Sequence, residues 1–434
     1  MNHTQPSYIK QDFTKPNSVL SLPVLVAALG YFVDIYDLLL FSIIRVPSLK
    51  NIGLTEAQIT SEGEHIISLQ MVGLLLGGIF WGILGDKKGR LSVLFGSILL
   101  YSLANIANGF VHTADQYAWI RFIAGIGLAG ELGAGITLVS ELIPKEKRGI
   151  ATSLVAGVGL LGAIVAFFIK QYFVQPDGTG WRTCYFIGGG LGFLLLILRI
   201  SVFESGMYQK VKQTAVQRGN FLMLFSNGER FRRYLLSIAI GLPTWYVIGV
   251  LVTFSKEFGK AMGIAEPIDA GKAVMYAYIG IALGDVIIGF ISQLFKSRKK
   301  ALYLFYALAI VFMILFFTVQ YNGSASVMYM LCGALGFSMG FWAIFVTIGA
   351  EQFGTNLRAT ATTTIPNFVR GILPLIIIIF EQIRTFLTNQ SHNAESSYIT
   401  GAWITGAIVT GLGLWAVIKI QETFGKDLNF LEHQ

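Results

Sequence analysis

Long apolar runs separated by short polar stretches recur along the whole chain and constrain its fold more than any other feature. Hydrophobic residues make up 54% of the chain and charged residues only 13%, with a mean hydropathy of +0.64. A soluble domain is about 25% charged. Since one membrane-spanning helix takes about 20 apolar residues, the composition predicts a membrane protein with many spans and short loops.

A helix-length window along the sequence finds twelve candidate spans. The predicted fold class is therefore an all-α membrane protein with twelve transmembrane helices. The spans are expected at residues 20–45, 66–85, 91–111, 118–143, 150–169, 184–200, 234–254, 273–295, 301–319, 327–349, 359–380 and 399–420.

Basic residues concentrate in every second loop and in the polar stretch between the sixth and seventh spans. Because cytoplasmic loops are enriched in Lys and Arg, this bias predicts that both termini lie in the cytoplasm. It also explains the net charge of +8, so no nucleic-acid partner is expected. Cys184 and Cys332 lie inside apolar runs, which supports neither a disulfide framework nor a cysteine metal site.

The longest internal polar segment lies where a linker between two six-helix halves would fall. An internal repeat supports this division, because Glu141 and Arg148 follow the fourth span with the same spacing as Glu351 and Arg358 after the tenth. Parallel six-helix repeats place a substrate site near the membrane midplane and open it alternately to each side. The sequence thus predicts an N-terminal half at 1–202, a cytoplasmic linker at 203–233, a C-terminal half at 234–420 and a cytoplasmic tail at 421–434.

The turn after the second span, residues 82–90 (GILGDKKGR), resembles the signature loop of the major facilitator superfamily. Arg121, followed by Gly125 and Gly130, is similar to the Arg motif in the fourth helix of that superfamily. The resemblance covers the whole chain and implies the major facilitator fold, in which two six-helix pseudo-repeats form one transporter.

Other segments resemble particular branches of the superfamily. Glu131 between Gly130 and Glu141, and Arg148 with the glycine after it, resemble the metabolite–proton symporters. Residues 30–37 (GYFVDIYD) resemble the acidic Tyr-Asp segment of metabolite and phosphate symporters. Residues 199–205 and 421–426 resemble two sugar-porter signatures, although both lack the expected proline. The branch therefore stays open between these groups.

A carboxylate at the end of the second span, Asp86, faces an unfavourable helix dipole and is expected to contact another helix N-terminus or a basic partner. The resemblance implies a conformational latch to the opposite half that holds the outward-facing state, and the alternative is a purely local turn. The counterpart segment 289–300 keeps the basic residues but has no matching acid. The expected latch residues are Gly85, Asp86, Gly89, Arg90, Glu141, Arg148, Glu351 and Arg358.

Ionisable groups inside spans cost at least about 2.5 kcal/mol near the bilayer centre, so they are candidate functional groups. One alternative is that they form buried ion pairs, Asp37 with Arg121 and Asp285 with Arg370. Against it, three acids and one Arg in the first half leave two excess carboxylates, which can carry protons. The resemblance implies that Asp37 is the titrating acid and Arg121 its partner. The proton-coupling candidates are Asp37, Arg121, Asp34 and Glu131.

Arg370 lies between Pro366 and Pro374 and directly before Gly371, which predicts an interrupted helix at a binding cavity. A planar guanidinium suits a carboxylate or a phosphate. A small anionic or zwitterionic metabolite is therefore expected in preference to a sugar. The substrate-binding candidates are Arg370, Asn367, Asp285, Trp245, Tyr246 and Trp342.

The predicted function is secondary active transport of a small polar metabolite by alternating access, driven by inward proton flow. The alternatives are a facilitator or exchanger of the same fold, or a non-transporting sensor, which would normally carry a large soluble output domain. An enzyme is not predicted, because the few His residues form no metal or nucleophile constellation. We expect a multi-pass protein of the bacterial inner membrane that works as a monomer, with substrate, protons and lipid as partners and no metal or other cofactor.

Overall fold

A computed structural model describes residues 19–144, 146–175, 177–199, 219–319 and 323–432. This described part contains helices and no strand, and twelve of its helical segments are long and apolar enough to cross a membrane. Each overlaps one of the predicted spans. The prediction of an all-α membrane protein is therefore confirmed.

Seven helices make up the first half within the described residues. They are α1 (Leu22–Asn51), α2 (Glu56–Lys88), α3 (Arg90–Asn108), α4 (Ala114–Leu128), α5 (Glu131–Leu142), α6 (Arg148–Phe173) and α7 (Trp181–Leu198). Of these, α4 and α5 together form the fourth span.

The one-turn helix η2 (Phe221–Leu224) lies in the stretch assigned to the linker and precedes the helices of the second half. The elements of the second half are α9 (Gly228–Tyr246), the π-helical turn η3 (Val247–Val252), α10 (Ser255–Ala261), α11 (Ala270–Leu294), α12 (Arg298–Thr318), α13 (Ala325–Ser338), α14 (Trp342–Gln352), α15 (Arg358–Gly371), α16 (Leu373–Ser391) and α17 (Ala394–Lys419). Helix α9 starts within the stretch 203–233 that the sequence assigns to the linker, and 203–218 lie outside the described residues.

Three spans are broken into two helices each, and the breaks lie where the functional groups gather. The fourth span breaks between α4 and α5, the tenth between α13 and α14, and the eleventh between α15 and α16. Pro374 lies in the first turn of α16, where a residue without an N–H group is tolerated because the first backbone donors of a helix have no intrahelical partner. The expected interruption beside Arg370 is thus present.

The two halves meet along two pairs of long helices, α6 with α11 and α2 with α15. Small residues make these crossings close, because a residue with little or no side chain lets two helices approach each other. A Cβ atom on Gly82 would lie 2.9 Å from the Cα atom of Thr360, and one on Gly289 would lie 2.6 Å from the Cβ atom of Ser153. Side chains larger than hydrogen at Gly82 and Gly289 would therefore push the halves apart.

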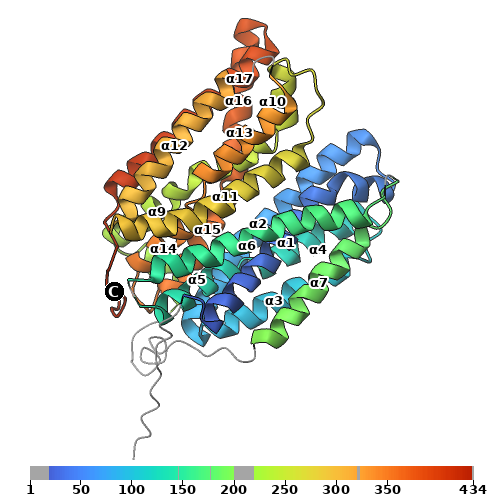
Figure 1. The fold of residues 1–434 in the computed structure, drawn as a ribbon. Helices are drawn as coiled ribbons and strands as arrows, with labels where there is room; N and C mark the ends of the chain where they lie inside the picture. The colour runs from blue at the N-terminus through green and yellow to red at the C-terminus, as the bar shows by residue number, and fades with distance from the viewer. Residues whose placement is uncertain (1–18, 145, 176, 200–218, 320–322, 433–434) are drawn as a thin grey trace, which may run out of the picture.

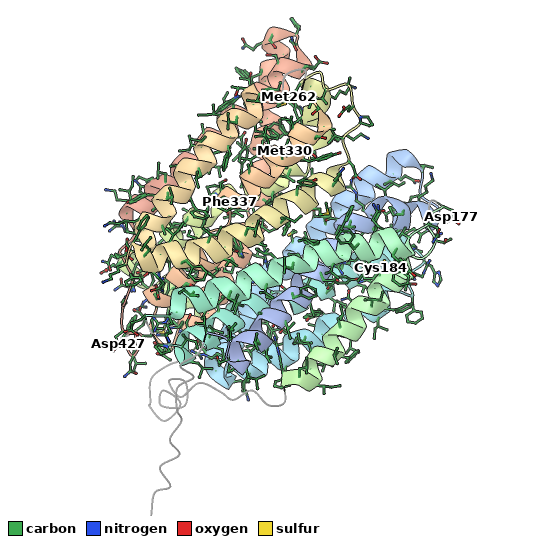
Figure 2. All side chains as sticks on the ribbon, in the orientation of Figure 1. Asp177, Cys184, Met262, Met330, Phe337 and Asp427 are labelled. Atoms are coloured by element: carbon green, nitrogen blue, oxygen red, sulfur yellow. The ribbon has the colours of Figure 1, made fainter. Side chains whose placement is uncertain are left out.

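The halves converge at the end of the bundle that carries the C-terminus and diverge toward the opposite end (Figure 1). Figure 2 places Asp427 of the tail at the first end and Asp177, in the loop between α6 and α7, at the other. We call the first end the latch end, because the predicted latch residues lie there.

Candidate functional site

Asp86 joins the two halves at the latch end. Its carboxylate oxygens accept hydrogen bonds from the backbone N–H groups of Ala359 (3.1 Å) and Thr360 (2.8 Å), in the first turn of α15. The guanidinium of Arg90 lies 3.4 Å away. Asp86 therefore meets both a helix N-terminus and a base, the two kinds of partner that the helix dipole predicts for it.

Glu141 and Glu351 each bind two arginines, one from each half. Glu141 accepts from Arg90 at 2.8 Å and from Arg358 at 2.9 Å. By the same pattern, Glu351 lies 3.1 Å from Arg298 and 3.3 Å from Arg148. These six residues and Asp86 are buried, and we call the seven the latch.

The second half thus repeats more of the latch than its sequence indicates. Arg298 contacts Glu351 as Arg90 contacts Glu141, although Leu294 stands four residues before Arg298 where Asp86 stands before Arg90. The base-rich counterpart loop is therefore an ion-pairing element, and only its acid is lost.

Two threonine pairs extend this symmetry across the halves, and the sequence analysis missed them. The hydroxyl of Thr137 lies 2.6 Å from that of Thr362, and Thr347 donates to Thr152 at 2.8 Å. In each half one Thr precedes the latch Glu by four residues and another follows the latch Arg by four. Extending the Glu-to-Arg repeat by one helical turn on either side would have found all of them.

Gly85 and Gly89, two glycines that the sequence analysis assigned to the latch, have a structural role. Gly89 has φ of 106°, a value that L side chains rarely adopt, and it separates α2 from α3. If Gly85 carried a Cβ atom, that atom would lie only 3.0 Å from the Cβ atom of Ala359. Gly85 therefore lets α2 approach the first turn of α15 closely enough for Asp86 to reach it.

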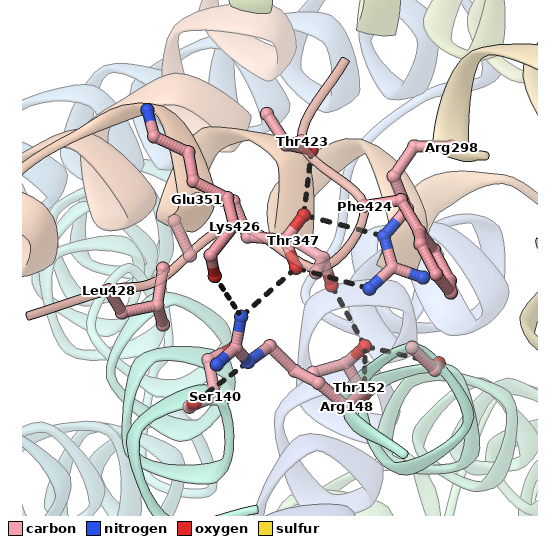
Figure 3. Close-up of polar contacts among 12 residues, drawn as sticks. Ser140, Arg148, Thr152, Arg298, Thr347, Glu351, Thr423, Phe424, Lys426 and Leu428 are labelled. Carbon is pink, nitrogen blue, oxygen red and sulfur yellow. Dashed lines mark hydrogen bonds and ion pairs between the residues drawn. The ribbon is translucent and has the colours of Figure 1, made fainter. Parts of the chain in front are cut away.

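The C-terminal tail crosses the latch end (Figure 3). Thr423 donates to Glu351 at 2.7 Å, and the carbonyl oxygens of Lys426 and Leu428 accept from Arg148 and Arg358 respectively. The tail therefore contacts latch residues of both halves and adds hydrogen bonds to their guanidinium groups.

Glu422 attaches the start of the tail to α12. Its carboxylate accepts hydrogen bonds from the hydroxyl of Ser297 and the backbone N–H groups of Arg298 (3.0 Å) and Lys299 (3.2 Å). Partial desolvation raises the pKa of Glu422, but these hydrogen bonds and one from Phe424 outweigh it and lower the pKa below its usual value. Glu432 attaches the other end of the tail through ion pairs with Arg230 and Arg233.

Asp37 and Arg121 form a closed, fully buried ion pair in the first half. The Nη1 atom of Arg121 donates to the carboxylate of Asp37 at 2.8 Å, and Nη2 donates to its backbone oxygen at 3.0 Å. Gln70 accepts from Nε of the same guanidinium at 3.3 Å. Two of the predicted proton-coupling residues are thus in contact.

Glu131 is paired with Arg199, which lies at the end of the predicted span 184–200 but was not counted among the ionisable groups inside the spans. Arg199, directly after α7, binds both carboxylate oxygens of Glu131, and it also donates to the backbone oxygen of Leu94 at 2.9 Å. The expectation of two excess carboxylates in the first half is therefore wrong, because Arg199 compensates one of them. The sequence analysis considered Arg199 only as the first residue of the segment 199–205 that resembles a sugar-porter signature.

Asp34 is the remaining carboxylate of that group. Its side chain is 0% exposed, and neither carboxylate oxygen has a hydrogen-bond partner within the described chain.

Arg370 lies beside two tryptophans rather than beside an acid. Its guanidinium carbon is 6.0 Å from the ring centroid of Trp245 and 5.7 Å from that of Trp342, within the range of cation–π contacts. Its Nη1 atom donates to Asn367 at 3.4 Å, and Asn367 donates across the halves to the backbone oxygen of Ala129 at 2.9 Å. In the residues that the structure describes, Arg370 forms no ion pair, and its Nε atom is buried without a partner.

Two other predicted substrate residues are placed differently. Asp285 accepts a hydrogen bond from the backbone N–H of Ala343 at 2.9 Å, so the alternative ion pair with Arg370 is absent from the described structure. Tyr246 donates to the backbone oxygen of Ala402 at 2.6 Å and so points toward α17. Arg370, Asn367, Trp245 and Trp342 form the site, and Tyr246 lies outside it.

Comparison with known proteins identifies the class to which this fold and site belong. The family model of the Major Facilitator Superfamily matches residues 27–377. The chain therefore belongs to that superfamily. It is a multi-pass membrane transporter of small metabolites, and similar bacterial transporters support a location in the inner membrane.

Similar proteins transport varied metabolites. The chain is 27% identical to the niacin transporter NiaP of Acinetobacter baylyi, over 77% of this chain and 80% of that protein. It is 25% identical to the sialic acid transporter NanX of Escherichia coli, over 79% and 82%. Among solved structures, the proton:xylose symporter XylE matches with a TM-score of 0.73 and 18% identity, over 94% of this chain and 97% of that one. At this identity XylE supports the fold alone.

Replacement of Asp86 by Asn should open the latch end. The amide keeps the shape but loses the charge that caps α15, at a cost of about 1 kcal/mol, or roughly a fivefold shift between conformations. Ser153 is buried against Gly289 of the other half, so thiol labelling of a Ser153→Cys reporter in a Cys-free background measures the opening. Labelling should rise and transport should fall at unchanged expression. Asp115→Asn, at the exposed start of α4, is the matched control, and equal labelling in both variants would contradict the latch role.

Replacement of Glu422 by Gln should loosen the tail. Since the pKa of Glu422 is lowered, its stabilising contribution is present at neutral pH and is lost as the pH falls through that lowered value. Loss of such a cap costs about 1 kcal/mol, so amide hydrogen exchange in residues 423–430 should quicken by roughly fivefold. Glu395→Gln, at the exposed start of α17, should leave this exchange unchanged. Equal exchange in wild type and Glu422→Gln would show that Glu422 does not hold the tail.

Proposed function

We propose that this transporter is a proton-coupled symporter of a small organic anion, with Arg370 as the group that binds the substrate carboxylate. One observation carries the proposal. A guanidinium that is 2% exposed lies at the junction of the two halves without an ion-pair partner in the described residues. Since an uncompensated buried charge is strongly unfavourable, an anion that enters the site gains the full interaction with it.

The surroundings of Arg370 favour a carboxylate with an apolar or planar body. Trp245 and Trp342 form a T-shaped pair with ring centroids 6.5 Å apart, and their indole N–H groups have no partner within the described part of the chain. These donors and the guanidinium suit an acceptor-only group such as a carboxylate. Niacin and sialic acid, named for two similar transporters, are both carboxylic acids.

Proton coupling is proposed for the pair of Asp37 and Arg121. While the pair is closed, the guanidinium stabilises the carboxylate. Separation of α1 from α4 during alternating access would leave Asp37 buried without its cation, a state in which the protonated form is favoured. The pair thereby links proton binding to the conformation of the first half.

A facilitator or exchanger of the same fold is the second candidate. The observation that favours it is the closed geometry of the Asp37 pair, which has the form of a structural ion pair. Collapse of uptake on addition of a protonophore distinguishes symport from both alternatives. A neutral sugar is disfavoured as substrate because it would leave the guanidinium of Arg370 without an anion.

Arg370→Ala should abolish binding of small carboxylates, and Arg370→Lys should weaken it by about 1–3 kcal/mol because the bidentate geometry is lost. A thermal-shift screen of organic acids, amino acids, osmolytes and sugars first selects the carboxylates that bind the purified protein. Calorimetry then measures their affinity for each variant. Nicotinate and its neutral amide form the first test pair, and nicotinate should bind more tightly. Arg384→Ala removes a half-buried guanidinium that is ion-paired with Glu381 outside the site, and it serves as control. Wild-type affinity in Arg370→Ala would show that this Arg does not bind substrate.

Asp37→Asn, which mimics the protonated acid, should abolish accumulation driven by a pH gradient. Because the variant keeps the shape of the site, it should still bind substrate and exchange labelled for unlabelled substrate across proteoliposomes. Linkage requires that protonation and substrate affinity influence each other reciprocally. Accumulation against the gradient with wild-type pH dependence would transfer the role to Asp34 or Glu131.

A further inference from the structure

Helix α15 makes polar contacts with the fourth span at three levels between the latch end and Arg370. The two segments run in opposite chain directions, so a later residue of α15 meets an earlier residue of the fourth span. The three contacts, in order from the latch end, are Arg358 with Glu141 (2.9 Å), Thr362 with Thr137 (2.6 Å) and Asn367 with the backbone oxygen of Ala129 (2.9 Å). All three must break when the halves separate at the latch end, and the contact of Asn367 is the one nearest to Arg370.

The side chain of Asn367 is enclosed by the first half. It is 1% exposed, and a Cβ atom on Gly78 of α2 would lie 2.9 Å from its Cβ and Nδ2 atoms. The oxygen that accepts from Asn367 belongs to Ala129, which lies between α4 and α5 where the fourth span is broken. The last carbonyl groups of a helix have no partner within that helix. Asn367 therefore supplies a donor at a break that needs one.

Arg370 fixes the orientation of this amide. The Nδ2 atom of Asn367 donates to the backbone oxygens of Ala129 and of Thr363 (2.8 Å), and a carbonyl oxygen can only accept. The Oδ1 atom must therefore face the remaining contact, which is the Nη1 atom of Arg370 at 3.4 Å. One buried amide thus joins the proposed substrate-binding guanidinium to a contact between the halves.

The internal repeat does not supply this arrangement twice. Asn367 and Arg370 follow the latch Arg of α15 by nine and twelve residues. At the same distances after Arg148, α6 carries Gly157 and Leu160. A Cβ atom on Gly157 would lie 2.4 Å from a side chain of α11, so this position serves close packing. Of the two corresponding helices, α15 alone carries the amide and the guanidinium.

We infer that Asn367 is a positioning residue that couples the occupation of Arg370 by substrate to the opening of the latch end. The inference rests on the proposed role of Arg370 in binding a carboxylate, and it adds how that binding reaches the junction of the halves. In the empty transporter, Asn367 holds α15 against the break in the fourth span.

A carboxylate on Arg370 competes with the amide for the guanidinium. The bond of 3.4 Å is longer than usual, and a charge-assisted bond to a carboxylate is about twice as strong as a bond to a neutral acceptor. Once Oδ1 of Asn367 loses its donor, the side chain is free to rotate and Nδ2 leaves the oxygen of Ala129. The contact nearest the site is thereby released, and the other contacts of α15 can separate toward the latch end.

Thiol labelling of the Ser153→Cys reporter tests the inference, with nicotinate as the first probe and the other screened carboxylates after it. Asn367→Leu keeps nearly the volume of the side chain but removes both hydrogen-bonding atoms. Labelling of this variant without ligand should rise roughly fivefold, the effect of losing one hydrogen bond. Nicotinate should raise labelling in wild type. In Asn367→Leu it should still bind but should change labelling no further.

Thr362→Val is the matched control, because it removes another contact of α15 with the first half, one that does not involve Arg370. Its labelling without ligand should also rise, but its response to nicotinate should remain. A response of wild-type size in Asn367→Leu would overturn the inference while leaving the proposed anion symport intact. Loss of nicotinate binding in Asn367→Leu, measured by calorimetry, would also overturn it, because Asn367 would then bind substrate directly.

A comparison without ligand decides the coupling if no carboxylate binds wild type, an outcome that would instead contradict the proposed function. Arg370→Ala removes the donor that holds Oδ1, so it should raise labelling, and its combination with Asn367→Leu should exceed neither single variant by much. Its combination with Thr362→Val should add the two effects, as independent sites do. Full addition for Arg370→Ala and Asn367→Leu would show that the amide does not transmit the state of Arg370. Asn367→Ala completes the same cycle if Asn367→Leu does not fold.

Discussion

Hydrocarbon offers no hydrogen bonds, so charged side chains within the spans turn inward, away from the lipid. This constraint organises the molecule. The latch, the pair of Asp37 with Arg121 and the pair of Glu131 with Arg199 are all buried. Since lipid-facing surfaces can carry only apolar side chains, the interior and the junction of the halves are where charge can be concentrated. The transporter's chemistry is located there for that reason.

The internal repeat places the same Glu and Arg in both halves, but the two halves differ in their other acidic contacts. Each half supplies a Glu at the end of its fourth span and an Arg at the start of its fifth, and each Glu accepts from an Arg of the other half. The halves differ in how the next helix is capped. Asp86 caps α15 of the opposite half, whereas Glu422 of the tail binds the start of α12. The tail thus adds an acid to the second half at the start of α12.

Much of the fold could be predicted from the sequence because apolar run length alone determines a membrane span. The dipole of α2 was enough to predict the kind of partner that Asp86 needs, but not which helix would supply it. Arg199 lies within the predicted span 184–200 but was not counted among the charges inside the spans, because at the end of an apolar run the sequence does not distinguish an interior residue from one at the membrane surface. The tail was missed as a structural element because its contacts are made by backbone carbonyls, whose partners leave no pattern in the side chains. Asp34 could be recognised as buried, but its lack of a partner depends on how neighbouring ion pairs form.

The ion pairs of the latch also bear on how easily the halves can separate. Removing two charges from water costs nearly as much as their mutual attraction returns, so a buried ion pair is close to energetic balance with its hydrated, separated form. When the latch end opens, water reaches Glu141, Glu351 and their arginines and solvates each of them. The hydroxyl pairs of Thr137 with Thr362 and of Thr152 with Thr347 exchange one hydrogen bond for another in the same way. Water therefore replaces the lost partners each time the latch end opens. The latch can hold the two halves together, and its opening is still easily reversed.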